Sequence, residues 1–279
     1  MHDDRGDRQI TTEGVAFAQQ LSSDGRRLYY LLRPNALDSF TELRSLELSS
    51  GKTDRLLPDQ SVTQYVVSRD EREVAFTTTT PEGVSEIWLA ALDRSTPPRL
   101  LVQGGDQVSF GAASDVIFRA LENKVNFLMR VRKDGSGRQR VLETPILNKF
   151  GVSPDGAWTA VLAPGTGEGA TFVTLAVPMR GGNPRAICAG CSIQWGPDGQ
   201  WLYVGPEGPS SSSVIVIPAG AAQAPPESLS TAIESAAKGS PLPGTRVIER
   251  PSVAPAGEPS IYAFARRDVQ RNLFRIPLH

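Results

Sequence analysis

A short turn motif recurs along this chain at intervals of 40 to 46 residues, and this repeat restricts the possible folds more than any other feature. Copies of the motif begin at Ser22, Ser68, Ser153 and Gly196, with weaker ones at Gly111 and Val253. Repeats of this length are typical of propellers and solenoids, in which each unit buries its apolar face against its neighbours.

Each unit contains four short apolar runs separated by polar turns. In the second unit the runs cover residues 61–67, 73–78, 86–92 and 98–102. Runs of this length, bounded by Gly, Pro, Asp and Ser, predict β-strands. The Asp-Gly pair between the first two runs predicts a hairpin turn, because Gly tolerates the positive φ that the turn requires. Four antiparallel strands per unit is the plan of a propeller blade.

The fourth run of each unit gives the number of blades. Five such runs are at 53–58, 98–102, 138–143, 184–188 and 245–250. A sixth, at 7–12, lies near the N-terminus, whereas the last run, at 272–279, resembles the third runs. We therefore predict one all-β domain over 1–279, a six-bladed β-propeller of four-stranded blades. Strand 7–12 would complete the last blade and so pair edges that would otherwise be open.

The turn aspartates look like candidates for catalysis, but their repetition favours a structural role. Asp24, Asp70, Asp155 and Asp198 occupy the same place in successive units. Aspartate is common in turns because its side chain accepts hydrogen bonds from the backbone two residues on. We assigned Asp115, in the most divergent unit, to the same series.

Residues 218–244 interrupt the repeat in blade five with a segment rich in Ala, Pro and Ser. A serine before an apolar run and a glycine after it predict a short helix there. We interpret the segment as a surface insertion; the alternative is a lid or docking element.

Charge and hydropathy exclude a nucleic-acid partner, a membrane segment and a signal peptide. The net charge is −1 and the basic residues are scattered, so we expect no nucleic-acid partner. No run approaches 18 apolar residues, so we expect no membrane segment in this chain. The first residues lack the apolar stretch of a signal peptide. We interpret the chain as a monomeric domain of a longer protein.

Histidine is nearly absent, since the chain has only His2 and His279. An interior Ser-His-Asp triad and a histidine-ligated zinc site are therefore excluded. We expect no catalytic residues, no metal and no cofactor in this chain. A hydrolase or lyase that uses carboxylates and a bound metal stays open, because oxygen ligands can come from different blades.

Cys188 and Cys191 form a C-x-x-C sequence between a fourth strand and the next first strand. No predicted helix follows them to lower a thiol pKa. A local disulfide is our first interpretation, two free buried thiols the second, and a metal or redox role the third.

Polar residues are concentrated in the loops that join second to third strands and one blade to the next. These loops share one mouth of the propeller, and rigid scaffolds carry function on loops. Most of these side chains belong to a solvated surface. As ligand-binding candidates for a small molecule, peptide or protein we select Arg33, Glu122, Lys149, Arg266 and Arg267.

The repeats resemble the TolB-like family of six-bladed propellers. The resemblance is carried by Ser22–Leu31, Ser68–Phe76, Ser153–Leu162 and Gly196–Val204. It implies the fold and says little about function.

Three later segments, 187–204, 243–250 and 262–278, resemble the C-terminal propeller of bacterial transmembrane serine/threonine kinases. That resemblance implies a sensor domain outside the cytoplasm, anchored through a larger protein. The chain has none of the kinase motifs, so it would have no phosphotransfer activity of its own. The alternatives are a TolB-like periplasmic scaffold that docks a protein, and the metal-dependent hydrolase or lyase.

Overall fold

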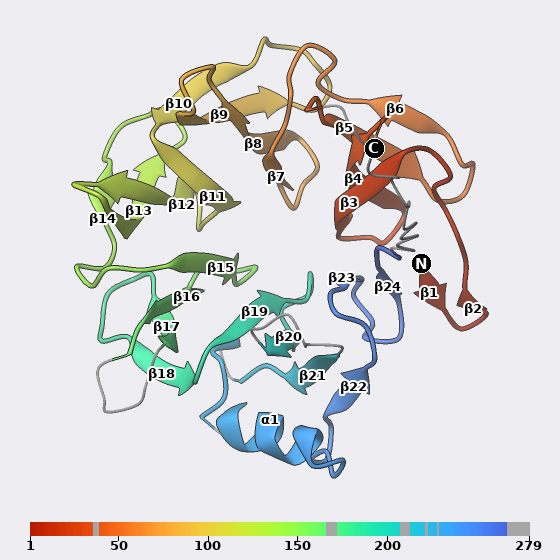
Figure 1. The fold of residues 1–279 in the computed structure, drawn as a ribbon, viewed down its shortest axis with the longest axis vertical. Helices are drawn as coiled ribbons and strands as arrows, with labels where there is room; N and C mark the ends of the chain where they lie inside the picture. Colours follow the sequence, from red (N-terminus) through yellow and green to blue (C-terminus); the bar gives the residue numbers. More distant parts are fainter. Residues whose placement is uncertain (36–38, 166–171, 207–212, 221–222, 228, 267–279) are drawn as a thin grey trace, which may run out of the picture.

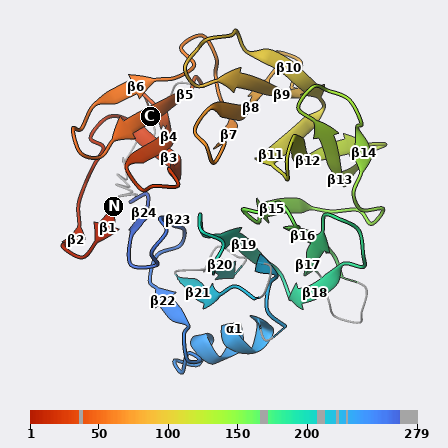
Figure 2. The same ribbon diagram turned by 180° about the vertical axis from the view of Figure 1, so that it is seen from behind.

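A computed structural model of the chain describes residues 1–35, 39–165, 172–206, 213–220, 223–227 and 229–266. It contains six four-stranded antiparallel sheets arranged as blades around a central axis (Figures 1 and 2). The predicted six-bladed, all-β propeller is therefore confirmed. In every blade but the last, the four strands follow one another in chain order from the axis outward.

The strand bounds follow the predicted runs closely. Blade one consists of β3 (Val15–Leu21), β4 (Arg27–Arg33), β5 (Glu42–Glu47) and β6 (Thr53–Arg55). Blade two consists of β7 (Gln64–Val67), β8 (Glu73–Thr79), β9 (Ser85–Ala91) and β10 (Arg99–Gln103). Blade three consists of β11 (Gly105–Phe110), β12 (Asp115–Glu122), β13 (Val125–Arg132) and β14 (Gln139–Arg140). Blade four consists of β15 (Asn148–Val152), β16 (Trp158–Pro164), β17 (Phe172–Pro178) and β18 (Arg185–Cys188). Blade five consists of β19 (Cys191–Trp195), β20 (Trp201–Pro206), β21 (Val214–Pro218) and β22 (Arg246–Ile248).

Blade six joins the two ends of the described chain. Its order is β23 (Ala254–Pro255), β24 (Tyr262–Ala263), β1 (His2–Asp3) and β2 (Gly6–Asp7). The N-terminal residues thus complete the last blade as predicted, but they supply its third and fourth strands and not one strand at 7–12. The tight turn between Asp3 and Gly6 pairs β1 with β2, and this hairpin takes both positions. Run 272–279, predicted to form the third strand, lies outside the described residues.

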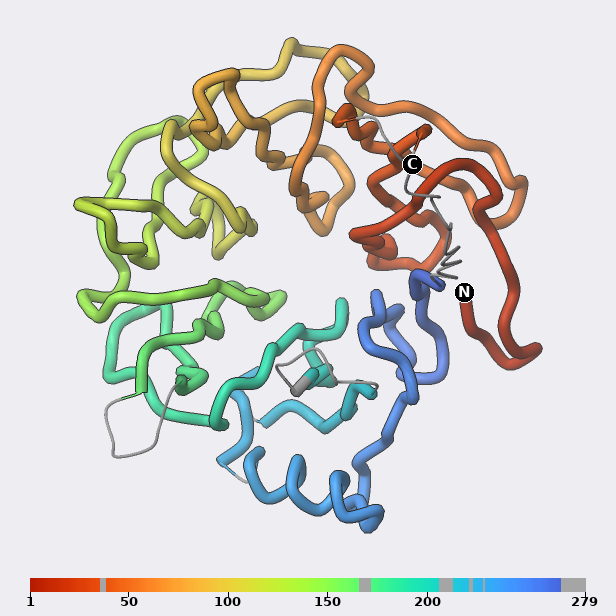
Figure 3. The backbone as a smooth tube through the Cα atoms, in the orientation of Figure 1, coloured from red at the N-terminus to blue at the C-terminus, as the bar shows by residue number. Residues whose placement is uncertain are grey.

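Side-chain contacts hold this closure together. His2 pairs with Tyr262 across the strands, and their rings stack with centroids 4.8 Å apart. Asp7 Oδ2 lies 2.8 Å from the guanidinium of Arg250. Figure 3 shows the first residues running beside the last described ones. Blade six is therefore closed by stacking and charge as well as by backbone pairing.

The turn aspartates have the structural role that the repeat predicts. The Ser153 hydroxyl donates to Asp155 Oδ1 at 2.6 Å, and the same oxygen accepts from the backbone N–H of Ala157 at 2.9 Å. The pairs Ser22–Asp24 and Ser68–Asp70 repeat this serine-to-aspartate bond at 2.7 Å. In blade five Gly196 replaces the serine, and Asp198 still accepts from a backbone N–H.

Blade three departs from this pattern, and Asp115 is not a turn aspartate. The N–H of Gly111 donates to the carbonyl of Asp115, which closes a turn one residue shorter than that of blade one, where Ser22 pairs with Arg27. Ala113 takes the positive φ, 52°. Asp115 is consequently the first residue of β12, and assigning it to the turn series was wrong.

Asp155→Asn is expected to change the free energy of unfolding by less than about 0.5 kcal/mol, because asparagine keeps the accepting oxygen and suits this turn. Asp155→Ala should cost about 1 kcal/mol, since it removes the acceptor of two hydrogen bonds. Chemical denaturation of both variants beside the parent provides the measurement. Equal losses for Asn and Ala would contradict this role.

The apolar core lies between successive blades. Phe76 and Phe118, one on the second strand of blade two and one on that of blade three, are fully buried. Helix α1 (Leu229–Ala237), within residues 218–244, buries Leu229 and Ala232 against the strands of blades four and five. In Figure 1 it covers the outer side of blade five. No helix in the described ranges is both long and apolar enough to cross a bilayer.

Candidate binding site

The strand directions give the propeller two different faces. Tight aspartate turns between first and second strands lie on one, which we call the turn face. The connections between second and third strands, and those between blades, lie on the opposite one, which we call the loop face. Figure 1 looks along the axis that joins the two faces.

Exposed apolar side chains gather on the loop face. Eight large apolar residues are exposed among those that the structure describes. Leu100 and Val247 lie on outer strands, and the other six lie where chains enter or leave the strands at the loop face. We call these six the loop-face apolar set: Val15, Phe40, Val84, Leu121, Val125 and Phe172. They come from four consecutive blades, one to four.

The hairpin of blade three presents two members of this set. Asn123 and Lys124 turn the chain with φ of 51° and 67°, so Glu122 pairs directly with Val125. A two-residue turn of this kind matches the twist of the two long strands that it joins. Leu121 is 60% exposed at its tip, the largest value among the exposed apolar residues.

Two of the predicted ligand-binding residues, Arg33 and Glu122, lie on the loop face. Arg33 ends β4, and its guanidinium carbon lies 5.8 Å from the centre of the Phe17 ring. Glu122 ends β12, where its carboxylate lies 2.8 Å from Arg140 and 3.9 Å from Arg138. Both side chains therefore already have partners within the protein.

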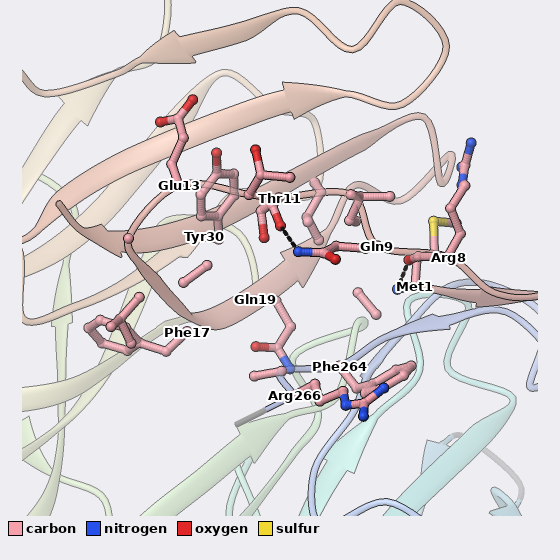
Figure 4. A pocket seen from close by; sticks show the side chains of 18 of the residues that line it. Met1, Arg8, Gln9, Thr11, Glu13, Phe17, Gln19, Tyr30, Phe264 and Arg266 are labelled. Carbon is pink, nitrogen blue, oxygen red and sulfur yellow. Dashed lines mark hydrogen bonds between the residues drawn. The ribbon is translucent and has the colours of Figure 1, made fainter. Parts of the chain in front are cut away.

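Arg266 is exposed at the edge of a cavity of about 730 Å³ between blades six and one. Figure 4 shows Phe264 and Arg266 on one side of this cavity, with Gln9, Thr11, Glu13 and Tyr30 on the other. Gln9 Nε2 donates to the Thr11 carbonyl at 2.9 Å. The chain continues from Arg266 into residues outside the described ranges, among them the fifth predicted residue, Arg267.

Lys149 is not in an inter-blade loop at the mouth, where we expected it. It lies in β15, the innermost strand of blade four, and is only 6% exposed. Its Nζ donates to Ser109 Oγ at 2.6 Å and to the carbonyl of Phe150 at 3.0 Å. Burial lowers the pKa of Lys149 to about 7, and the nearby charge of Asp106 opposes this shift.

A second cavity, of about 640 Å³, occupies the central channel at the turn face. Its walls are the ends of the innermost strands, and Ser109, Phe110 and Gly151 are among the residues that line it. Every residue that lines this cavity belongs to the described part of the chain. Sequence patterns gave no reason to select Ser109.

Cys188 and Cys191 are joined by a disulfide, with their Cα atoms 6.1 Å apart. The bond connects the end of β18 with the start of β19, so it ties the outer edge of blade four to the inner edge of blade five. Thr174 supports this link, because its hydroxyl donates to the Cys191 carbonyl at 2.7 Å.

Among the described residues, no three His, Cys, Asp or Glu side chains lie close enough together to hold a metal ion. Of the five residues predicted as a binding site, the four that the structure describes are not brought together either. Sequence reasoning favoured polar loops and passed over the apolar set. The available signal was a large apolar residue inside an otherwise polar loop, as at Phe40 and Val84.

No family model and no curated protein sequence matches this chain. Several solved structures superpose on it. TolB from Acinetobacter baumannii superposes with a TM-score of 0.62 and 13% identity over 78% of this chain and 56% of its own. An oligogalacturonate lyase in complex with manganese superposes with a TM-score of 0.58 and 13% identity, over 75% of this chain and 64% of its own. A putative TolB from Agrobacterium tumefaciens superposes with a TM-score of 0.57 and 16% identity, over 76% of this chain and 80% of its own. The chain thus spans little more than half of the first of these proteins. At such identities the likeness concerns the fold alone, and the fold of this chain is the TolB-like six-bladed propeller.

Proposed function

We propose that this chain is a non-catalytic, protein-binding propeller whose partner docks on the loop face. The observation that carries the proposal is the loop-face apolar set, which repeats over four consecutive blades. Single exposed apolar residues are ordinary on any surface, whereas their collection on one face is typical of an interaction site. Leu121 and Val125 on their hairpin would be the central contacts.

Two carboxylates near this set, Glu42 and Glu122, are already paired, as in the polar rim of an interface. Glu42 lies between two arginines, 2.6 Å from Arg44 and 3.4 Å from Arg55. Glu122 is held in the same way by Arg140. A partner that covers the apolar set therefore leaves these two carboxylates with their counter-ions.

The finer proposal is that the chain is the extracytoplasmic sensor domain of a receptor-like serine/threonine kinase. The resemblance of its later repeats to such propellers supports it. The Cys188–Cys191 disulfide supports the location, since disulfides persist in oxidising compartments. A TolB-like periplasmic scaffold would use the same loop face. A metal-dependent hydrolase or lyase is the alternative function from another class. The fold shared with the manganese-bound lyase suggests it, although a shared fold does not transfer activity.

Site-specific photo-crosslinking in cells that encode the protein tests the docking face. A photoreactive amino acid at positions 84, 121 or 172 should give a crosslink to one partner. The same group at 100 or 247, which are equally apolar and exposed on outer strands, should not. Leu121→Asp should abolish crosslinking from position 84. Equal crosslinking from both sets of positions would overturn the proposal.

A further inference from the structure

Two bulged strands bring a serine and a buried lysine together inside the channel. The pairing register shifts between Asp106 and Ser109 in β11, and between Lys149 and Val152 in β15. Bulges of this kind re-aim side chains and are common next to functional sites. The result is the 2.6 Å contact between Lys149 Nζ and Ser109 Oγ, across the boundary of blades three and four.

Gln107 fixes this arrangement. It has a φ of 50°, unusual for a residue with a side chain, and the neighbouring blades hold it there. Its backbone N–H donates to Gln64 Oε1 at 2.7 Å, and its own Oε1 accepts from the backbone N–H of Lys149 at 2.6 Å. The innermost strands of blades two, three and four are thereby locked together around the serine and the lysine.

Lys149 has no carboxylate partner in the part of the chain that the structure describes. Asp106, whose charge acts on Lys149, forms a bidentate ion pair with Arg119, with contacts of 2.8 Å and 2.5 Å. Arg119 thus keeps Asp106 from neutralising the lysine. A buried ammonium without a counter-ion is costly, and an incoming anion would relieve that cost.

Ser109 connects this lysine to the central cavity. The serine lines the cavity and the lysine lies behind it. Two carboxylates also line the cavity, and both are engaged elsewhere. Asp70 is held by Ser68 at 2.7 Å, and Glu71 by the hydroxyl of Tyr29 at 2.6 Å. Lys133 also lines the cavity, and its ammonium is paired with Glu73.

We propose that the central cavity binds a small ligand through a carboxylate group, which accepts a hydrogen bond from Ser109 and is attracted by the charge of Lys149 behind it. This site goes beyond the proposed function, because it lies in the channel and not on the loop face. The cavity of about 640 Å³ is of the size that small-molecule sites have.

Protonation of the lysine controls the direction of the serine hydroxyl. The charged ammonium donates to Ser109 Oγ, which leaves the hydroxyl hydrogen free to point at an anion in the cavity. The neutral amine instead accepts that hydrogen, and the serine no longer offers it to a ligand. Since burial places the pKa of Lys149 near 7, binding of a carboxylate takes up a proton above that pH.

Titration of the whole chain with sodium acetate, at constant ionic strength and followed by NMR, tests the site. We expect saturable shifts at the signals of Ser109 and Gly151 and an increase in the apparent pKa of Lys149. The dissociation constant should rise by up to about tenfold for each pH unit above 7. Ser109→Ala and Lys149→Met should each abolish the saturable shifts.

Ser192→Ala is the matched control, because Ser192 also lies on an innermost strand but bonds to the Gly205 carbonyl. It should bind acetate like the parent, and so should Leu121→Asp on the loop face. Absence of saturable shifts, their survival in either Ser109→Ala or Lys149→Met, or an affinity independent of pH would overturn the proposal. Failure of the loop-face crosslinking would leave this result unaffected.

Discussion

Removal of residues 1–12 is expected to lower the free energy of unfolding by at least about 3 kcal/mol. The deletion takes away β1 and β2 and uncovers Tyr262, which is otherwise buried beneath the stacked ring of His2. Full exposure of one large side chain costs about 1.5–3 kcal/mol. Loss of the Asp7–Arg250 ion pair and of the strand pairing adds to this, and leaves β24 as an open edge.

Thermal and urea unfolding of the truncated chain beside the parent provide the measurement. A synthetic peptide with residues 1–12 should restore part of the lost stability when added in excess, because binding to the folded state stabilises it by mass action. A scrambled peptide of the same composition is the control. The closure described for blade six would be wrong if the truncated chain melted at the parent's temperature.

The free energy of unfolding of the parent is expected to depend on pH through Lys149, and Lys149→Met should remove this dependence. In the unfolded chain a lysine keeps its proton up to a pKa of about 10.4, whereas in the fold burial lowers the pKa of Lys149 to about 7. Between these values the unfolded state binds more protons, so the stability of the parent rises with pH. Below pH 7 both states are protonated, and the cost of the buried charge is fully present.

Urea unfolding of both proteins from pH 6 to pH 9 measures this effect. The stability of the parent relative to Lys149→Met should increase by up to about 1.4 kcal/mol for each pH unit above 7. The subtraction removes the titration of groups that both proteins share. Lys133→Met, which changes a lysine paired with Glu73, serves as the control variant at the same pH values. A difference independent of pH would mean that Lys149 is not buried as described.

The repeat made the blades predictable because each one contains its own strand and turn signals. Asp24, Asp70, Asp155 and Asp198 lie in the turns that their spacing indicated. The assignment of Asp115 to this series was wrong because the turn of blade three is one residue shorter. Counting residues between repeats cannot detect a deletion that leaves the strands intact. The closing strands were misplaced by a few residues, because a hairpin of two-residue strands carries almost no periodic signal.

The candidate sites were less predictable, since they depend on neighbours from different blades. Whether Lys149 faces solvent or the interior follows from the bulge in β15 and from Gln107 in the adjacent blade. Its assignment to an inter-blade loop had placed it at the mouth together with Arg33 and Glu122. The loop-face apolar set becomes visible only when the connections of four blades are brought to one face.

The construction of blade six also constrains how the protein can be made. A chain grows from its N-terminus, so β1 and β2 are made before the other strands of this propeller, yet β1 pairs with the strand that contains Tyr262. The hairpin of β1 and β2 can therefore dock only after nearly all the other strands have been synthesised. The blades between them can form one by one during this time, but the ring closes only after β24 has been synthesised. A ribosome stalled within blade five would hold an open arc whose first blade is exposed, and such an arc is the form of this protein most in need of a chaperone.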